Sequence, residues 1–404
     1  MKKIKNALIG QSGGPTAVIN ASLAGAITKY LSLENCSVIY GAVNGIKGVL
    51  REEFINLNEI FSDEKNVNLL MQTPSSYLGS CRYRLSKDSD NEIEKIVSIL
   101  QKNDIGYFFY IGGNDSMDTV MRLSKICNSN GIKAIGIPKT IDNDLVGTDH
   151  CPGYGSSAKY ISTTISEMAL DASCYDIKNV LIVEIMGRNA GWLAASSALA
   201  RNSLNTAPDL IYLPEKPFDD EKFLFDIRQK LLHQDTVVVA VSEGIRYENG
   251  NYVAQSSSES KKDMFGHSQL GGVCKKLELL VKSRLGIKVR GVELNLPQRC
   301  ASHNVSKTDI EEAFKCGEFA VESALNGESG KMITMNRVEN SNYEVSFSAV
   351  DISEIANGEK IVPDSFINAD GNDVTPEFIK YASPLIQGER DIIFENGIPA
   401  YIKK

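Results

Sequence analysis

Short apolar runs that alternate with helical segments constrain the fold of this chain more than any other feature. Runs such as "IGYFFYI", "VLIVEIM" and "TVVVAVS" are almost purely apolar, whereas a strand with one face in water would alternate apolar and polar residues. Continuous apolar strands separated by helices are typical of parallel sheets that are covered on both faces. The sequence therefore predicts an α/β fold with mostly parallel sheets covered by helices.

The length of the chain predicts more than one lobe. It has 404 residues, and single cores rarely grow beyond about 250–300 residues. We predict one lobe over residues 1–145 and a second over 146–325, with parts of the chain crossing between them. Residues 326–404 lose the α/β rhythm, although they contain a strand-like "YEVSFSAV" and a helical stretch around 375–382. We expect them to form a C-terminal extension packed on the main body.

Charge, hydropathy and cysteine usage exclude several functional classes. The net charge of −8 argues against a general nucleic-acid binder, which would usually be basic. No apolar run approaches the roughly 18–20 residues that span a membrane. The eight cysteines include no C-x-x-C pair and the four histidines are scattered, so neither a zinc site nor a disulfide framework is expected. Reduced thiols in the cytoplasm fit this pattern best.

Five polar loops each follow an apparent strand. They are "GQSGGP", "IGGNDS", "IPKTIDND", "EIMGRNAG" and "VSEG". The carboxyl ends of parallel strands meet at one edge of a sheet, and ligands of open α/β sheets bind there. We therefore expect these loops to contribute to one site.

Three of the candidate stretches have a structural and a functional interpretation. The loop with Gly13 and Gly14 could bring backbone N–H groups to an anion, or it could be a tight turn into a helix. Asp115, after Asn114 in the second loop, could face a ligand, or Asp115 or Ser116 could cap the following helix. Arg82, after a Gly-Ser turn, could bind phosphate or be solvated.

The stretch "IPKTIDND" concentrates one cation and two carboxylates where a strand ends. It could be a solvated turn, since Asp and Asn are common turn formers. Alternatively, Asp142 could accept the proton of a sugar hydroxyl, and Lys139 could stabilise charge on a phosphoryl group in flight. Arg188, Arg299 and Glu243 follow neighbouring strands, and this combination suits a phosphorylated sugar.

These stretches, in this order from about Ile4 to Leu325, resemble the phosphofructokinase family, with "TIDND" followed by "MGR" as the most specific pair. The resemblance implies a two-lobed phosphofructokinase-like fold, with the phosphoryl donor bound by the lobe over residues 1–145 and fructose 6-phosphate by the lobe over 146–325. It implies phosphoryl transfer to the 1-hydroxyl of fructose 6-phosphate, giving fructose 1,6-bisphosphate in glycolysis or gluconeogenesis. It also implies Mg²⁺ as cofactor and a homodimer or homotetramer whose second subunit completes the sugar-phosphate pocket.

The resemblance implies roles for individual residues. Asp142 would be the general base, Lys139 would stabilise the transition state and the leaving phosphate, and Arg188 would assist the transfer. The diphosphate-binding residues would be Gly13, Gly14, Arg82, Asn114 and Asp115. The fructose 6-phosphate-binding residues would be Thr140, Ile141, Asp142, Asp144, Met186, Gly187, Arg188, Glu243, Arg290, Leu296 and Arg299.

Two positions bear on the phosphoryl donor. ATP-using members of the family usually read G-G-D-G-S and P-G-T-I-D-N-D, whereas this chain has Asp115 at the last glycine of the first pattern and Lys139 at the single glycine of the second. Both replacements resemble the pyrophosphate-using branch. A carboxylate at position 115 adds bulk and negative charge where the α-phosphate of ATP would lie. We therefore expect pyrophosphate as donor, in a reaction close enough to balance to run in both directions.

Three positions depart from the family pattern. Asn114 replaces an aspartate associated with Mg²⁺, so the ion is expected mainly on pyrophosphate, near Asn114 or Asp115. Asn179, beside Lys178, replaces an arginine that binds phosphate. Leu296 stands where ATP-using members often have histidine.

Four alternatives to this function were weighed. An ATP-dependent 6-phosphofructokinase and a non-catalytic sugar-phosphate sensor stay open. A related kinase acting on NAD or a lipid would not carry the "TIDND" and "MGR" pair. A dinucleotide-dependent oxidoreductase would need G-x-G-x-x-G, and the first loop lacks that spacing.

Overall fold

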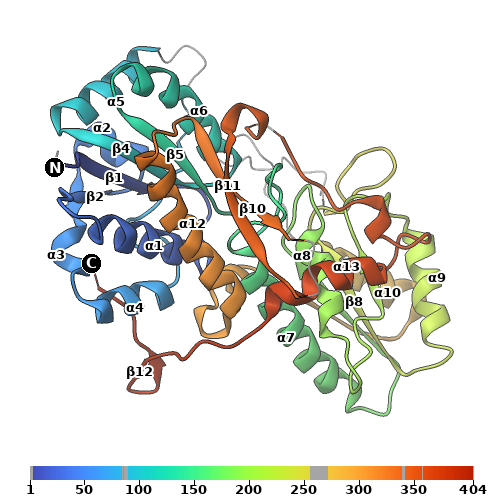
Figure 1. Cartoon of the computed structure of the whole chain (residues 1–404). Coiled ribbons are helices and arrows are strands. Elements are labelled where there is room, and N and C mark those ends of the chain that lie inside the picture. Colours follow the sequence, from blue (N-terminus) through green and yellow to red (C-terminus); the bar gives the residue numbers. More distant parts are fainter. Residues whose placement is uncertain are drawn as a thin grey trace.

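The computed structural model describes residues 3–83, 85, 90–254, 272–338, 342–356 and 358–403. The residues outside these ranges include Arg84, Ser89 and most of a polar, serine-rich segment at 246–269. Within the described residues, two mostly parallel sheets with helices on their faces form the body of the protein (Figure 1). The predicted α/β fold is confirmed, and no helix in the described ranges is long and apolar enough to cross a membrane.

The first sheet has seven strands in the order β11-β10-β5-β4-β1-β2-β3. All neighbours are parallel except the edge pairs β2–β3 and β10–β11, which are antiparallel. The strand bounds are β1 (Asn6–Gln11), β2 (Ile39–Ala42), β3 (Phe54–Asn56), β4 (Ile105–Gly112), β5 (Lys133–Pro138), β10 (Lys331–Arg337) and β11 (Val345–Asp351).

Helices cover both faces of this sheet (Figure 1). Successive residues of a strand point to opposite faces, so Ala7 and Ile9 enter one core whereas Leu8 enters the other. One face packs against α1 (Ile19–Leu31) and α12 (Lys307–Leu325), and the other against α5 (Asp90–Lys102) and α6 (Asn114–Ser129). The shorter helices of this lobe are α2 (Ile46–Arg51), α3 (Leu57–Phe61) and α4 (Glu64–Gln72).

Helix α1 begins later than the sequence suggested. The alanine-rich stretch that follows Pro15 favours a helix from its start, but the backbone becomes helical only at Ile19. The hydroxyl oxygen of Thr16 accepts the N–H of Val18 at 3.3 Å, and this local bond favours a turn over a helix.

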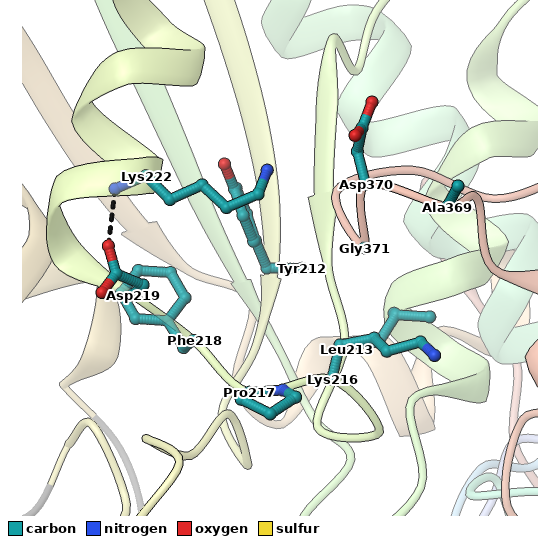
Figure 2. A pocket seen from close by; sticks show the side chains of 10 residues that line it. All are labelled: Tyr212, Leu213, Lys216, Pro217, Phe218, Asp219, Lys222, Ala369, Asp370 and Gly371. Carbon is teal, nitrogen blue, oxygen red and sulfur yellow. Dashed lines mark hydrogen bonds between the residues drawn. The ribbon is translucent and has the colours of Figure 1, made fainter.

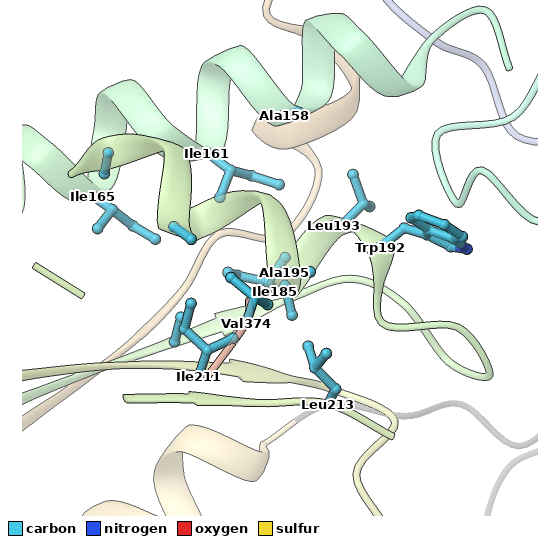
Figure 3. Packing of buried hydrophobic residues seen from close by; sticks show 14 of the residues in the cluster. Ala158, Ile161, Ile165, Ile185, Trp192, Leu193, Ala195, Ile211, Leu213 and Val374 are labelled. Carbon is cyan, nitrogen blue, oxygen red and sulfur yellow. The ribbon is translucent and has the colours of Figure 1, made fainter. Parts of the chain in front are cut away.

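The second sheet has four parallel strands in the order β7-β8-β6-β9. These are β7 (Leu210–Tyr212), β8 (Thr236–Ser242), β6 (Asn179–Ile185) and β9 (Lys288–Glu293). Figure 3 shows one core of this lobe, where α7 (Tyr154–Ser173) and α8 (Trp192–Ser196) pack over the strands. The opposite core contains α9 (Asp220–Lys230) and α10 (Val273–Leu285), and the short α11 (Pro297–Cys300) follows β9.

The C-terminal part of the chain contacts both lobes (Figure 1). Strand β11 and helix α13 (Pro376–Ala382) lie where the sequence indicated a strand and a helix, whereas β10, which joins β11 to β5, was not predicted. Helix α13 packs beside α8, and Val374 enters the second-lobe core (Figure 3). The chain then returns past β12 (Phe394–Glu395) and β13 (Ile398–Pro399) to α4. The boundaries at 145 and 325 stay predictions.

A buried ion network joins the loop after β5 to α12 and β10. The Nδ1 of His150 lies 2.8 Å from a carboxylate oxygen of Asp149, and its Nε2 lies 2.7 Å from Glu312 of α12. Arg337 of β10 donates to the same oxygen of Asp149 at 3.0 Å, and the hydroxyl of Tyr343 donates to Glu312 at 2.7 Å. Three segments far apart in sequence are thereby tied together.

Folding stability is expected to depend on the charge of His150. Burial lowers the pKa of His150, but Glu312 and Asp149 outweigh this effect and raise it from 6.5 to about 9. The folded state therefore binds the proton more tightly than the unfolded state, so the stabilisation is fully present below pH 6.5 and is lost as pH rises through about 9. Urea unfolding from pH 6 to 10 should show the parent losing free energy of unfolding relative to His150→Gln. The exposed His233→Gln is the matched control, and parallel pH curves for parent and His150→Gln would contradict the prediction.

Candidate active site

The predicted polar loops lie at the carboxyl ends of strands in both sheets. Those with Gly13, Asn114 and Lys139 follow β1, β4 and β5, and those with Met186 and Glu243 follow β6 and β8. Because each strand is parallel to its neighbours among these five, the loops of each sheet gather at one edge.

The first glycine loop contacts two cationic side chains. The Nζ of Lys139 donates to the carbonyl of Gly14 at 2.6 Å. A Cβ atom would lie 3.3 Å from the Nζ of Lys139 if added to Gly13, and 3.3 Å from an Nη of Arg299 if added to Gly14. The N–H of Gly13 donates to the carbonyl of Cys81 at 3.2 Å. Positive charge at this loop therefore comes from Lys139 and Arg299, while the Gly13 amide is bonded within the chain.

The second loop enters α6 without a side-chain cap. The residue before the first turn is Gly113, which offers no side chain, and Asn114 and Asp115 already belong to the helix. The alternative in which Asp115 or Ser116 caps α6 is therefore wrong. Asp115 lies in the first turn, where the helix dipole favours a carboxylate.

The amide oxygen of Asn114 fits a ligand at this loop. It is buried and has no hydrogen-bond partner among the described residues, although buried polar atoms are nearly always satisfied. Oxygen atoms of amides and carboxylates are ligands for Mg²⁺. The amide oxygen of Asn114 and the carboxylate of the adjacent Asp115 are thus compatible with a magnesium ion.

The third loop holds a buried lysine and two half-buried carboxylates. Lys139 is 4% exposed, and burial lowers its pKa to about 8 although Asp142 and Asp144 oppose this shift. Burial, Asp144 and Glu243 raise the pKa of Asp142 to about 7, with Lys139 and Arg188 acting in the other direction. A carboxyl group with a pKa near neutrality is well suited to general base catalysis.

The backbone of this loop is ordered by its own side chains. The N–H of Asp142 donates to the hydroxyl oxygen of Thr140 at 3.1 Å, and Ile141 turns into the second-lobe core. Burial raises the pKa of Asp144, and one of its carboxylate oxygens is buried without a partner in the described parts of the chain. Asp144 therefore offers a further acceptor for a ligand.

The second sheet contributes the loop with Met186, Gly187 and Arg188. Gly187 adopts a φ of +135°, which suits glycine, and its N–H donates to Glu243 at 3.3 Å. Burial raises the pKa of Glu243, while the Gly187 bond and Arg188 lower it. Arg188 also lowers the pKa of Asp142 electrostatically, so the charges of this loop reach the Asp142 loop.

Gln298 is a residue of this region that the sequence analysis missed. It is 2% exposed, accepts the N–H of Met186 at 3.1 Å and donates to the carbonyl of Asn295 at 2.9 Å. Its position directly before Arg299 was the available signal, but the sequence analysis assigned a role only to the arginine. Gln298 links α11 to the Met186 loop and so holds Arg299 near the site.

Three predicted residues are exposed. Arg82 follows the Gly-Ser turn at the surface, Arg290 lies on the edge strand β9, and Leu296 is 53% exposed after it. Among the described residues, neither Arg290 nor Leu296 makes a hydrogen bond or ion pair with Asp142.

Asn179 lies at the opposite, amino end of β6. Its amide donates to the hydroxyl of Thr236 at 2.9 Å and to the carbonyl of Ile177 at 3.0 Å. The Nζ of Lys178 donates to the carbonyl of Leu231 at 2.8 Å. Neither side chain takes the place of the family's phosphate-binding arginine at this chain's own site.

A separate hollow of about 170 Å³ lies in the second lobe (Figure 2). It shares no residue with the predicted site. Its two lysines are paired, Lys216 with Asp364 at 2.9 Å and Lys222 with Asp226 at 3.1 Å. The lining residues are Tyr212, Leu213, Lys216, Pro217, Phe218, Asp219, Lys222, Ala369, Asp370 and Gly371. Because these charges are satisfied, the hollow is a weaker candidate than the Asp142 region.

The fold and the Asp142 region together define a phosphotransferase of the mostly parallel α/β class. The family profile described as "Phosphofructokinase" matches residues 6–292. The chain belongs to the phosphofructokinase family. It is 40% identical to a pyrophosphate–fructose 6-phosphate 1-phosphotransferase from Halomonas elongata, over 98% of this chain and 96% of that protein.

Two further comparisons describe the range of similarity. The crystal structure of a pyrophosphate-dependent phosphofructokinase from Marinobacter aquaeolei matches with a TM-score of 0.87 and 39% identity, over 98% of this chain and 95% of that one. A sulfofructose kinase from Alkalicoccus urumqiensis is 34% identical over 89% of this chain and 91% of that protein. The similarity to the pyrophosphate-dependent proteins thus covers the C-terminal extension as well as both sheets.

Proposed function

We propose that this protein transfers a phosphoryl group from pyrophosphate to the 1-hydroxyl of fructose 6-phosphate, giving fructose 1,6-bisphosphate and phosphate. The observation that carries the proposal is Asp142, a half-buried carboxylate with a pKa of about 7 in the same loop as the buried cation Lys139. The name of the relative from Halomonas elongata supports the donor and the acceptor.

The reaction follows from the groups around Asp142. Its carboxylate accepts the proton of the 1-hydroxyl as that oxygen forms a bond to the terminal phosphorus of pyrophosphate. The bond from this phosphorus to the bridging oxygen breaks, and phosphate leaves with the bonding electrons. Lys139, Arg188 and Arg299 are placed to stabilise the charge on the phosphoryl oxygens and the leaving phosphate. The proton on Asp142 is then released to solvent.

Further groups bind the two substrates. Glu243 is placed to accept hydrogen bonds from sugar hydroxyls, with Thr140, Asp144, Met186 and Gly187 around the sugar. Mg²⁺, when bound, neutralises charge on pyrophosphate oxygens, and Asn114 or Asp115 would hold it on the protein side. Asp115 selects against ATP, because its negative charge lies past the end of bound pyrophosphate, at the position that the α-phosphate of ATP would take. We place the protein in the cytoplasm.

The proposal includes a homodimer or homotetramer. Arg290 and Leu296 are exposed on the edge strand and the turn that follows it. A second copy packed over this edge would bury them and complete the pocket for the 6-phosphate. Asn179, which replaces the family's phosphate-binding arginine, contributes no positive charge to that pocket.

A donor assay tests the proposed function. Purified protein is incubated with fructose 6-phosphate and Mg²⁺, with either pyrophosphate or ATP, and fructose 1,6-bisphosphate is measured with coupled aldolase. Product with pyrophosphate alone is the expected result. Product mainly with ATP would keep the family and overturn the donor assignment, and no product with either would favour the sugar-phosphate sensor. Sulfofructose in a parallel reaction tests the acceptor, because the sulfofructose kinase is also related.

A further inference from the structure

Asn143, between Asp142 and Asp144, has an unusual backbone conformation. Its φ is +54°, a left-handed value that is uncommon for residues other than glycine and that asparagine adopts more readily than most. Its side chain is fully buried. The φ and ψ angles of Asn143 determine how the chain turns between the two carboxylates, so whatever holds Asn143 also sets the direction of Asp142.

Three groups surround the side chain of Asn143. Its oxygen accepts the N–H of Cys151 at 3.0 Å and lies 3.5 Å from the Nζ of Lys360. Its amide donates to the hydroxyl oxygen of Tyr381 at 2.9 Å. Lys360 and Tyr381 lie more than two hundred residues further along the chain, in the C-terminal part.

Lys360 and Tyr381 also hold the far end of the same loop. The hydroxyl of Tyr381 donates to the carbonyl of Asp149 at 2.8 Å. The Nζ of Lys360 donates to that carbonyl at 2.8 Å, and its backbone N–H donates to the carbonyl of Asp144 at 2.8 Å. The two residues therefore connect the Asn143 side of the loop to the Asp149 side.

The two residues are anchored to the second lobe through Trp192, the single tryptophan of the chain. The Nε1 of Trp192 donates to the carbonyl of Lys360 at 2.9 Å. Its ring centroid lies 5.4 Å from that of Tyr381, and the Nζ of Lys360 lies 5.2 Å from the Trp192 ring. Trp192 opens α8, beside α13 with Tyr381 (Figure 1). These contacts with Trp192 limit the positions that Lys360 and Tyr381 can take.

We propose that Lys360 and Tyr381 are positioning residues, which hold Asn143 in its left-handed conformation and thereby aim Asp142 at the sugar hydroxyl. Neither residue is placed against the substrate. The kinetic consequence rests on the proposed function, whereas the restraint on the loop does not. The C-terminal part of the chain thus completes the catalytic loop of a site built from the two sheets.

The test compares Tyr381→Phe with a matched tyrosine. Tyr381→Phe removes one hydroxyl and keeps the ring against Trp192. Tyr30→Phe is the control, because the Tyr30 hydroxyl also donates to a backbone carbonyl, that of Lys5, but lies in the first-lobe core away from the Asp142 loop. We expect Tyr381→Phe to lower kcat on the order of tenfold, because small misplacement of a reacting group is costly. The KM values should change by no more than about twofold, because substrate binding is retained.

Hydrogen exchange provides the readout that does not need activity. In the ligand-free protein, amides of residues 140–151 should exchange faster in Tyr381→Phe than in the parent, whereas Tyr30→Phe leaves them unchanged. Unchanged exchange in Tyr381→Phe, or a kcat no lower than that of Tyr30→Phe, would overturn the positioning role. If the parent has no activity with either donor, the proposed function fails, and exchange alone still decides the restraint. Lys360→Met is the second variant, and it should increase the exchange of amides 140–151 in the same way.

Discussion

Asp142→Asn is expected to lower kcat by a factor on the order of 10³, since a positioned general base contributes about 10²–10⁴. Asparagine has the size of aspartate and keeps the backbone N–H that donates to Thr140, so the loop should keep its shape. It cannot take the proton of the 1-hydroxyl. The KM for fructose 6-phosphate should change little, because the sugar contacts of the other residues are retained.

The pH dependence of kcat/KM provides an independent check on Asp142. Its pKa of about 7 means that the carboxylate form is lost as pH falls below neutrality. The base must be deprotonated to act, so kcat/KM of the parent should fall about tenfold for each pH unit below that value. Asp142→Asn should lack this acid limb. Steady-state kinetics from pH 5.5 to 9 measure both effects.

Asp63→Asn is the matched control for this substitution. Asp63 caps α4 through a bond to the N–H of Lys65 at 2.9 Å, and asparagine is an equally good cap. Its kcat and pH profile should equal those of the parent. If Asp142→Asn keeps turnover within about tenfold of the parent, below the range typical of a general base, another group must accept the proton.

The double variant Asp115→Gly with Lys139→Gly is expected to change the donor. We expect the ratio of kcat/KM for ATP to that for pyrophosphate to rise on the order of 10²-fold, because loss of a single charge-stabilising donor costs about 10²–10³. Lys139→Gly removes the cation that lies against the first glycine loop, so pyrophosphate loses stabilisation of its leaving group. Asp115→Gly removes the negative charge expected near the α-phosphate of ATP, so ATP loses a repulsive contact.

The single variants separate the two effects. Lys139→Gly should weaken pyrophosphate use without creating much ATP use, and Asp115→Gly should admit ATP while pyrophosphate still reacts. Asp115→Asn keeps the size of the side chain and removes its charge, which distinguishes bulk from electrostatics. Steady-state rates with both donors are measured at saturating fructose 6-phosphate. An unchanged donor ratio in the double variant would contradict the assignment of Asp115 and Lys139.

The sheets and the polar loops after them could be predicted from the sequence because both depend on local patterns. Buried parallel strands require uninterrupted apolar residues, so β4, β5, β6 and β8 were visible as short runs. The loop from Lys139 to Asp149 was visible for the same reason, since its residues directly follow β5. The family resemblance also rests on such contiguous stretches, and the family comparison confirmed it.

Features that depend on long-range or side-chain contacts were not predicted. The sequence of β10 mixes apolar and polar residues without a clear strand pattern, although the strand is mostly buried. It becomes a strand through pairing with β11 and β5. The start of α1 depended on one hydroxyl contact of Thr16. In both cases a long-range or side-chain interaction overrode the local pattern.

Residue types and their order along the chain were enough to indicate a phosphoryl-transfer site around Asp142 and Lys139, because the chemistry requires a base and a cation close together. The sequence could not show that Arg299 reaches the Gly14 loop, that Arg188 acts on Asp142, or that Lys360 and Tyr381 hold Asn143. These pairs are separated by tens to hundreds of residues, and they meet because the two sheets and the returning C-terminal chain pack against each other. Contacts of this kind depend on how whole elements bury their apolar faces, which no short stretch of sequence encodes.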